Sequence, residues 1–350
     1  MNETTDHKRR NFLRAASGSA LAAASAGALA QSVEFKPNSR YPDTAVQLVD
    51  PSFGKYRIYS SSVEQLATGF RWAEGPVWFG DGRYILLSDI PNNRIVRWDE
   101  VTGQTSTYRA NAGYTNGLGR DRQGRLIACE HLGRRITRTE YDGTITVLAD
   151  QFNGKPLNSP NDLAVGRDGS IWFTDPPFGI SGHYEGEKAK AEQPHGVYRI
   201  DGTTGKLSRV LEDLPFPNGI AFTPDGKGVY LVGRSAQGVR LIFRYDVTAD
   251  GRLINKSTVF DAGLTGTLDG IKCDEDGNIW AGWGSTNNAP GALSADMDGV
   301  ICINTAGKII GHIHLPERCA NLCFGGAKGN RLFMASSHSL YAVHVETRGV

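Results

Sequence analysis

Six segments of the chain share one plan, and this internal repeat limits the possible folds more than any other feature. Each segment opens with a polar residue beside a small one, continues as an apolar strand, turns through Asp-Gly or a similar pair, and returns as a second strand. The openings lie 42 to 57 residues apart. They are Glu74, Asn116, Asn161, Asn218, Asp269 and Asn321. A period near fifty residues without helical periodicity is typical of the blades of a β-propeller.

Each segment has room for four strands and their turns. A second hairpin of alternating polarity follows the opening pair, as in RIVRWD at 94–99 and LIFRYD at 241–246. Asp-Gly pairs supply the positive φ of tight hairpins. These pairs are Asp81-Gly82, Asp142-Gly143, Asp168-Gly169, Asp225-Gly226, Asp250-Gly251 and Asp276-Gly277. The sequence therefore predicts an all-β, six-bladed propeller with four antiparallel strands per blade, and the sixfold register disfavours a sandwich or jelly roll.

The last segment is one strand short, because only five residues follow the strand expected at 340–345. The segment VEQLA at 63–67 resembles the missing strand. We expect this N-terminal strand to complete the last blade and close the ring, which removes exposed sheet edges. The 43 glycines and 15 prolines favour one large all-β domain over two average ones. We therefore expect a single propeller domain over residues 31–350.

The first thirty residues are typical of a twin-arginine export signal. KRRNFLR at 8–14 precedes a stretch rich in Ala, Ser and Gly, which ends in ALA at 28–30 before Gln31. The alternatives are a disordered basic tail or a membrane anchor, but the apolar run is short and poor in large side chains. We expect residues 1–30 to be removed by the twin-arginine machinery, with no stable membrane insertion afterwards. The mature protein would be periplasmic or secreted.

Charge and cysteine content exclude several classes of partner. The chain has 38 Lys and Arg against 37 Asp and Glu, with no basic run beyond residue 14, so nucleic acid is not an expected partner. The five cysteines are an odd number, and none forms the close C-x-x-C pair of a zinc site. At least one thiol is therefore unpaired within a monomer. Cys319 and Cys323 would be bridged only across a bend, because four residues of extended strand separate them too far.

The six openings also predict a metal site. The first strand of each blade lines the axial channel of a propeller, so equivalent openings converge at one end of it. All six opening residues carry side-chain oxygens, and Glu74 and Asp269 are carboxylates. Hard cations take such ligands, and the lack of His and Cys in this ring disfavours zinc or copper. One Asn before Gly is usually a turn former, but six equivalent positions, one of them a Glu before Gly-Pro, need another explanation.

Five segments carry a family resemblance that covers nearly the whole mature chain. They are EGPVW at 74–78, NSPNDL at 158–163, SIWFTDP at 170–176, PNGIAF at 217–222 and LDGI at 268–271. Together they resemble the gluconolactonase, regucalcin (senescence marker protein) and LRE-like superfamily, to which diisopropyl fluorophosphatase is related. The resemblance implies one divalent cation held by Glu74, Asn161, Asn218 and Asp269, with Ca²⁺ first and Mg²⁺, Mn²⁺ or Zn²⁺ as alternatives. Leu268 stands where the family usually has proline, which changes the stiffness of the turn more than the ligands.

A metal ion in a channel mouth suits lactone hydrolysis, because it polarises a carbonyl and orients water. The resemblance implies that Asp269 is the base for the attacking water, with Glu74 a firmer metal ligand. The alternative is that Asp269 only holds the metal and a metal-bound water attacks. The predicted function is a divalent-metal-dependent lactonase, and the predicted substrate is a sugar or aldonic lactone. An organophosphate or other ester hydrolase and a non-catalytic ligand-binding propeller are the alternatives.

The substrate contacts are predicted from the inner ring and the ends of the second strands. Asn116 is the expected substrate-positioning residue of the inner ring. The second strands end in an outer ring of Asp89, His131, Asp175 and Arg234. His131 is predicted to contact a sugar hydroxyl or transfer a proton, with a hydrogen-bonded structural histidine as the alternative. The insertion at 176–195, on the same face, is expected to be a lid or a solvated loop.

Overall fold

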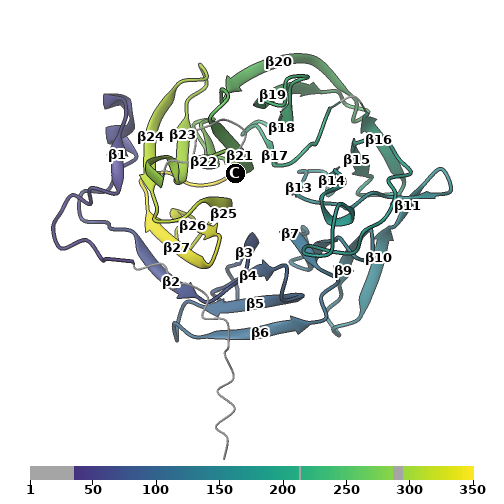
Figure 1. Cartoon of the computed structure of the whole chain (residues 1–350), viewed down its shortest axis with the longest axis horizontal. Coiled ribbons are helices and arrows are strands. Elements are labelled where there is room, and N and C mark those ends of the chain that lie inside the picture. Colours follow the sequence, from purple (N-terminus) through teal and green to yellow (C-terminus); the bar gives the residue numbers. More distant parts are fainter. Residues whose placement is uncertain (1–34, 213, 287–294) are drawn as a thin grey trace, which may run out of the picture. The chain divides into compact units, whose positions relative to one another are not determined.

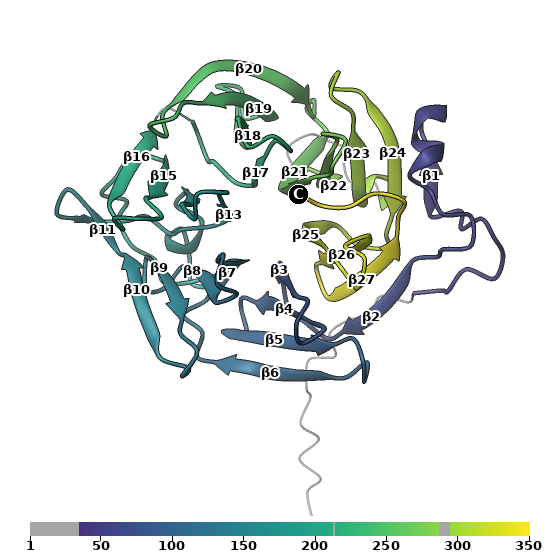
Figure 2. The same ribbon diagram turned by 180° about the vertical axis from the view of Figure 1, so that it is seen from behind.

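The computed structural model describes residues 35–212, 214–286 and 295–350, and strands dominate it. Six antiparallel sheets follow one another around a ring (Figures 1 and 2). Strand order within the sheets follows the chain from an innermost strand outward, except that an N-terminal strand forms the outer edge of the last two sheets. The all-β fold with six blades of four antiparallel strands is confirmed.

The strands have the following bounds. Blade 1 contains β3 (Ala73–Phe79), β4 (Tyr84–Asp89), β5 (Arg94–Asp99) and β6 (Thr105–Ala110), and blade 2 contains β7 (Thr115–Arg120), β8 (Leu126–Glu130), β9 (Arg135–Thr139) and β10 (Ile145–Ala149). Blade 3 contains β13 (Leu163–Val165), β14 (Ile171–Asp175), β15 (Gly196–Ile200) and β16 (Leu207–Leu211), and blade 4 contains β17 (Ile220–Phe222), β18 (Gly228–Arg234), β19 (Arg240–Val247) and β20 (Leu253–Asp261). Blade 5 contains β21 (Gly266–Cys273), β22 (Ile279–Ser285), β23 (Gly299–Ile303) and β24 (Ile309–His314), and blade 6 begins with β25 (Cys319–Gly325), β26 (Arg331–Ser336) and β27 (Ser339–His344). A small hairpin, β11 (Gln151–Phe152) and β12 (Lys155–Pro156), separates blades 2 and 3, and short 3-10 helices occupy η1 (Pro51–Lys55), η2 (Phe178–Ile180) and η3 (Ala295–Met297).

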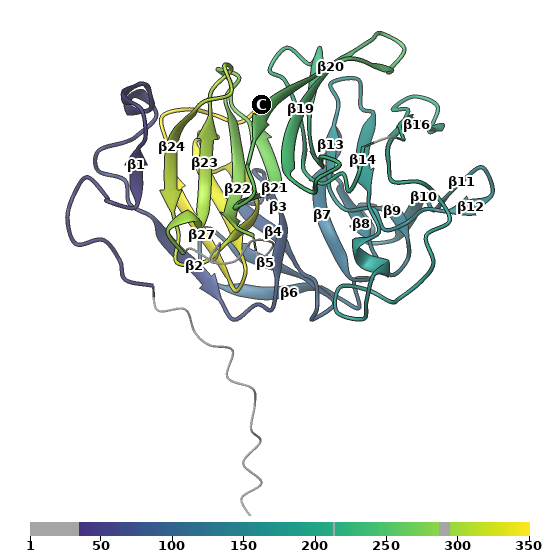
Figure 3. The same cartoon turned by 45° about the horizontal axis from the view of Figure 1, so that its top comes forward.

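The innermost strands contact one another around the ring. β3 contacts β7, β7 contacts β13, and the series continues through β17, β21 and β25 back to β3. Six clusters of buried apolar side chains lie between neighbouring blades, including the last and the first. Figure 3 shows the blades side by side along this ring. The apolar faces of the sheets thus pack on each other, and the openings of the innermost strands are brought to one end of the channel.

The ring is closed by an N-terminal strand, as the sequence predicts. β2 (Glu64–Thr68) pairs antiparallel with β27, with Gln65 opposite Tyr341, and becomes the fourth strand of blade 6. A second N-terminal strand, β1 (Val46–Leu48), pairs with β24 and adds a fifth strand to blade 5. The following η1 places Phe53 against Trp280, with ring centroids 5.7 Å apart. The segment before the first blade therefore covers two blades, not one.

One Asp-Gly turn differs from the prediction. Five of the six turn glycines have positive φ, but Gly82 does not, and Arg83 takes the left-handed conformation in its place with φ 51°. The Arg83 side chain donates to Glu100 Oε2 at 3.0 Å, while its carbonyl accepts the backbone N–H of Glu100 at 2.9 Å. These two contacts offset the cost of a side chain in this region of φ.

All five cysteines are free and buried. Cys319 and Cys323 lie on the same strand, β25, which is why they do not pair. Burial raises the pKa of each of the five thiols. Because the thiolate is the reactive form, these cysteines are chemically inert in the folded protein.

The predicted export signal at residues 1–30 lies outside the described residues. Among the residues that are described, none of the helices has the length and apolar character needed to cross a bilayer.

Candidate functional site

Close packing between blades explains why several opening residues are followed by glycine. In three blades, a Cβ on this glycine would lie within 2.5 Å of the carbonyl oxygen of the next opening residue. The glycines and the residues they would meet are Gly75 with Asn116, Gly117 with Asn161, and Gly219 with Asp269. No side chain fits at such distances. The openings are thus locked to one another through the backbone, and these glycines are required by close approach.

Asp269 joins three neighbouring blades at the channel mouth. Its Oδ1 accepts a hydrogen bond from Asn218 Nδ2 at 2.7 Å, and its Oδ2 accepts one from Arg318 Nη2 at 2.7 Å. Asp269 lies in blade 5 and is 7 % exposed, Asn218 immediately precedes blade 4, and Arg318 immediately precedes blade 6. The structure therefore brings Asn218 and Asp269 together, 51 residues apart in the chain.

Glu74 is a second buried carboxyl at the mouth, 3 % exposed. Burial, and next the charge of Asp269, raise the pKa of Glu74 well above its usual value. The N–H of Gly75 donates to its Oε2 at 2.9 Å, and the side chain of Asn321 also hydrogen-bonds to it. Two carboxyl groups from distant blades therefore interact electrostatically in a buried place.

Asn116 and Asn161 are linked to this group through the backbone. The N–H of Gly117 donates to the carbonyl of Asn161 at 2.7 Å, and Ser88 Oγ donates to the carbonyl of Asn116 at 2.7 Å. Both asparagine side chains are buried. Across residues 35–212, 214–286 and 295–350, no three His, Cys, Asp or Glu side chains gather in a way that would hold a metal ion. A cation at the mouth would therefore take most of its ligands from amide oxygens and water.

His131 directly follows β8 and is fully buried. Its Nδ1 lies 2.9 Å from the carbonyl oxygen of Glu185. Burial lowers the pKa of His131 to about 4, so the ring is neutral at pH 7. A carbonyl only accepts, so Nδ1 carries the proton and Nε2 remains an acceptor. Nε2 is buried without a hydrogen-bond partner.

We expect the stability of the protein to depend on pH through His131. The folded-state pKa of about 4 lies below the ordinary value of 6.5, so the contribution is complete above pH 6.5 and is lost as the pH falls toward 4. The shift corresponds to about 3 kcal/mol. Urea unfolding between pH 7 and 4.5 should show a steeper loss for the wild type than for His131→Asn. The exposed His183 gives the control, His183→Asn, which should follow the wild type; equal slopes for the wild type and His131→Asn would contradict this assignment.

The insertion at 176–195 packs over the mouth on one side and meets solvent on the other. A Cβ on Gly179 would lie 2.4 Å from His131 Cγ, so the insertion rests directly on this ring. Burial, and next the charge of Asp269, raise the pKa of Glu185 to about 7, while Arg318 opposes the shift. The outward side chain of Tyr184 is 56 % exposed. The insertion therefore contacts His131 on one side and is exposed to solvent on the other. Whether it acts as a lid stays a prediction.

Two residues at the mouth were not predicted, Arg318 and Glu185. Arg318 lies three residues before the opening Asn321, and Glu185 lies within the charged insertion. Blade 1 has an arginine at the same point, Arg71, but the other four blades do not, so the repeat gives only a weak signal for Arg318. Glu185 lies in an insertion that has no counterpart in the repeat.

Two members of the predicted outer ring have local structural contacts. Asp89 accepts hydrogen bonds from the N–H of Arg71 at 2.9 Å and from Arg94 Nε at 2.9 Å. Asp175 Oδ2 accepts the N–H of Asn158 at 2.8 Å, and burial raises the pKa of Asp175 to about 7. These carboxyls fix the loops that carry the mouth residues.

Comparison with protein families gives a match over most of the propeller. The model of the SMP-30/gluconolactonase/LRE-like region matches residues 72–338. The gluconolactonase of Zymomonas mobilis subsp. mobilis is 30% identical over 311 residues, which cover 83% of this chain and 83% of that protein.

Solved structures agree with this family match. A gluconolactonase from Xanthomonas campestris superposes with a TM-score of 0.77 at 32% identity, covering 86% of this chain and 94% of the other. A calcium-binding protein, regucalcin, from Agrobacterium tumefaciens has a TM-score of 0.64 at 20% identity and covers 82% of this chain and 94% of its own. At 20% identity, the likeness to regucalcin concerns the fold alone.

Proposed function

Because this chain belongs to the SMP-30/gluconolactonase/LRE-like family, we propose that it hydrolyses a sugar or aldonic lactone at the channel mouth. The gluconolactonases similar to most of this chain support the reaction class. One observation carries the assignment to this place: the buried carboxylate of Asp269 is held by Asn218 and Arg318 and interacts electrostatically with a second buried carboxyl, Glu74. Such a concentration of buried, interacting acids is typical of functional sites.

Asp269 would act as the general base. A water oxygen attacks the acyl carbon of the lactone while the Asp269 carboxylate takes one proton from that water. The bond between the acyl carbon and the ring oxygen then breaks, and the proton passes to the ring oxygen, which leaves as a hydroxyl of the opened acid. Asn218 and Arg318 orient the base through its two oxygens. His131, whose Nε2 is an acceptor, and Asn116 would bind substrate hydroxyls.

The mouth fits a hard divalent cation by its chemistry. Glu74 is bonded to the N–H of Gly75 and to the side chain of Asn321, it is buried, and it is close enough to Asp269 to feel its charge. Uncompensated buried carboxylates are costly, and a bound cation would offset that cost. Glu74, Asn161, Asn218 and Asp269 would hold the ion, with Ca²⁺ first and Mg²⁺, Mn²⁺ or Zn²⁺ as alternatives. Bound there, it would polarise the lactone carbonyl as a Lewis acid.

The calcium-binding relative from Agrobacterium tumefaciens supports a cation in this fold. The experiments on Asp269 described below also test the alternative in which this residue only holds the ion.

The test is a pH-stat screen of the purified mature protein on five- and six-membered sugar lactones, with and without chelator. We expect acid release from at least one lactone, and its loss on chelation. The same protein is assayed on a phosphotriester and an aryl ester. Activity on these esters alone would replace the lactonase by the ester-hydrolase alternative. Inactivity on every compound, with ligand binding retained, would favour the non-catalytic propeller.

Export by the twin-arginine route is a further part of the proposal, supported by the sequence of residues 1–30. Five buried thiols with raised pKa suit a protein that folds before it reaches an oxidising compartment. The location proposed is the periplasm or the medium.

A further inference from the structure

A cavity of about 370 Å³ lies between blades 4 and 5 and the start of blade 6. One of its lining residues, Arg318, donates a hydrogen bond to Asp269. Three arginines line the cavity. Arg234 ends β18 and Arg240 begins β19, directly opposite each other in the hairpin, while Arg318 precedes β25. Its volume is in the range of sites for small ligands.

These arginines have hydrogen-bonding capacity that the protein leaves unused. Arg234 Nε, Arg240 Nη1 and Arg318 Nε are buried atoms without a hydrogen-bond partner. Burial lowers the pKa of Arg234, and lowers that of Arg240 to about 10, with Asp269 partly opposing both shifts. The guanidinium of Arg240 is therefore charged at pH 7. Buried charges without full pairing cost stability, and such exceptions in a folded protein call for a functional explanation.

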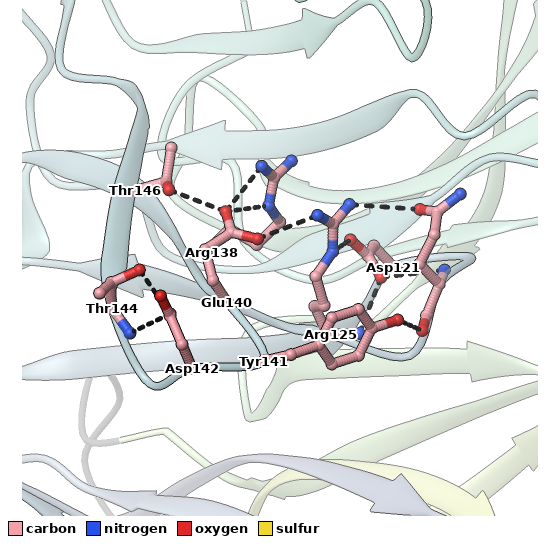
Figure 4. A network of polar contacts seen from close by, with 9 residues as sticks. Asp121, Arg125, Arg138, Glu140, Tyr141, Asp142, Thr144 and Thr146 are labelled. Carbon is pink, nitrogen blue, oxygen red and sulfur yellow. Dashed lines mark hydrogen bonds and ion pairs between the residues drawn. The ribbon is translucent and has the colours of Figure 1, made fainter.

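Four arginines outside the cavity also have a buried N–H group without a partner: Arg109, Arg120, Arg134 and Arg331. Each of these four still pairs with a carboxylate. Figure 4 shows the network in blade 2, where Arg125 donates to Asp121 and Glu140, and Arg138 donates to Glu140, at 2.7 to 2.9 Å. Within the described part of the chain, Arg234 and Arg240 differ from these arginines, because neither has a carboxylate partner.

The carboxyls near the cavity do not use these N–H groups. Of the three guanidiniums, Arg318 donates to Asp269, through Nη2. The charge of Arg318 also acts to lower the pKa of Glu185 and of Asp298, against the effect of burial. Aromatic rings fix two of the guanidiniums, with Arg234 4.5 Å from the Phe216 centroid and Arg318 5.6 Å from that of Trp72. The planar guanidinium fork is suited to carboxylate and phosphate oxygens.

We infer that this cavity binds an anionic group, a carboxylate or a phosphate, at the end of the lactone substrate remote from its reacting carbonyl. Arg318 connects the two parts of the site, because its Nη2 orients Asp269 while its Nε has no protein partner. The inference rests on the proposed function, since it assigns hydrolysis to Asp269. The substrate class would be lactones of aldaric acids or phosphorylated aldonic acids, and the product would carry two acidic groups.

The experiment compares three lactones: neutral glucono-1,5-lactone, glucaro-1,4-lactone with its free carboxylate, and 6-phosphogluconolactone. The wild type should show a higher kcat/KM for one anionic lactone than for the neutral one, and the preferred compound identifies carboxylate or phosphate. Arg240→Met should lower the ratio of anionic to neutral kcat/KM at least tenfold. Arg252→Met removes an exposed arginine from the opposite end of blade 4, where it pairs with Asp250, and should keep the wild-type ratio. An unchanged ratio in Arg240→Met would overturn the inference.

Two further measurements separate the possible failures. Arg240→Met should unfold at the same or a higher urea concentration than the wild type, because it removes an incompletely paired buried charge, so its lost selectivity would not reflect misfolding. Thermal shift titrations with glucarate and inorganic phosphate should stabilise the wild type and not Arg240→Met. Binding in these titrations without hydrolysis of any lactone would refute the lactonase and support the anion site. Hydrolysis without anion preference or binding would refute the anion site alone.

Discussion

Replacement of Asp269 by asparagine should lower kcat/KM for the hydrolysed lactone by about 10²- to 10⁴-fold, the usual contribution of a general base. Asparagine matches the size of aspartate and keeps one oxygen as an acceptor for Arg318. Asp269→Ala should also abolish turnover, but it would leave both Arg318 Nη2 and Asn218 Nδ2 without their partner. Initial rates at saturating calcium, together with the urea midpoint of each variant, test the prediction.

Asp298→Asn is the matched control, since Asp298 is a partly buried acid of the same part of the chain whose charge also acts on Arg318. It should retain near-native turnover. Native turnover in Asp269→Asn would exclude the base role. If turnover in Asp269→Asn falls at low calcium and recovers at high calcium, Asp269 serves as a metal ligand and not as the base.

Periodic features of the fold could be read from the sequence, whereas single contacts could not. The six openings recur, and VEQLA at 63–67 was recognisable because it matches a strand that the last blade lacks. β1 has only three residues and no alternation, and its place depends on the free edge of β24. A strand whose pairing is decided by another blade leaves no local signal.

The same distinction applies to the site. Glu74, Asn218 and Asp269 stand at equivalent points of the repeat, so the sequence predicted their meeting at the mouth. Arg240 and Glu185 are ordinary charged residues in sequence, and only the packing of a hairpin and an insertion makes them part of the mouth.

Glycines after the openings illustrate a residue type whose cause the sequence alone does not decide. In isolation, Asn-Gly and Asp-Gly indicate tight turns. Gly117 and Gly219 have no positive φ, and they are glycine because the next blade's backbone approaches within 2.5 Å of where a Cβ would lie. A tight turn and a close contact between blades both require glycine, so the sequence does not distinguish these two causes.

Glu74→Gln should move two stability measurements in opposite directions. Without divalent ions, the variant should be at least as stable as the wild type, because a neutral amide replaces a buried carboxyl that feels the charge of Asp269 while still accepting the Gly75 N–H. With calcium at a hundred times its Kd, the wild type should gain about 2.7 kcal/mol. The variant should gain little, since one of the two carboxylate ligands is gone.

Urea midpoints in EGTA and in calcium measure both effects on the same samples. Glu317→Gln provides a matched control, because Glu317 is a buried carboxyl of the neighbouring loop that is bonded to Tyr341 and to the N–H of His338. It should lose stability in EGTA, because an amide NH2 replaces one of the two oxygens that accept these hydrogen bonds, yet it should keep the full calcium gain. An equal calcium gain in Glu74→Gln and the wild type would mean that Glu74 does not hold the ion. Relative to the wild type, Glu74→Gln should have an equal or higher urea midpoint in EGTA and a lower one in calcium if Glu74 is a ligand. Loss of a carboxyl that only supports the fold would lower the midpoint in both solutions.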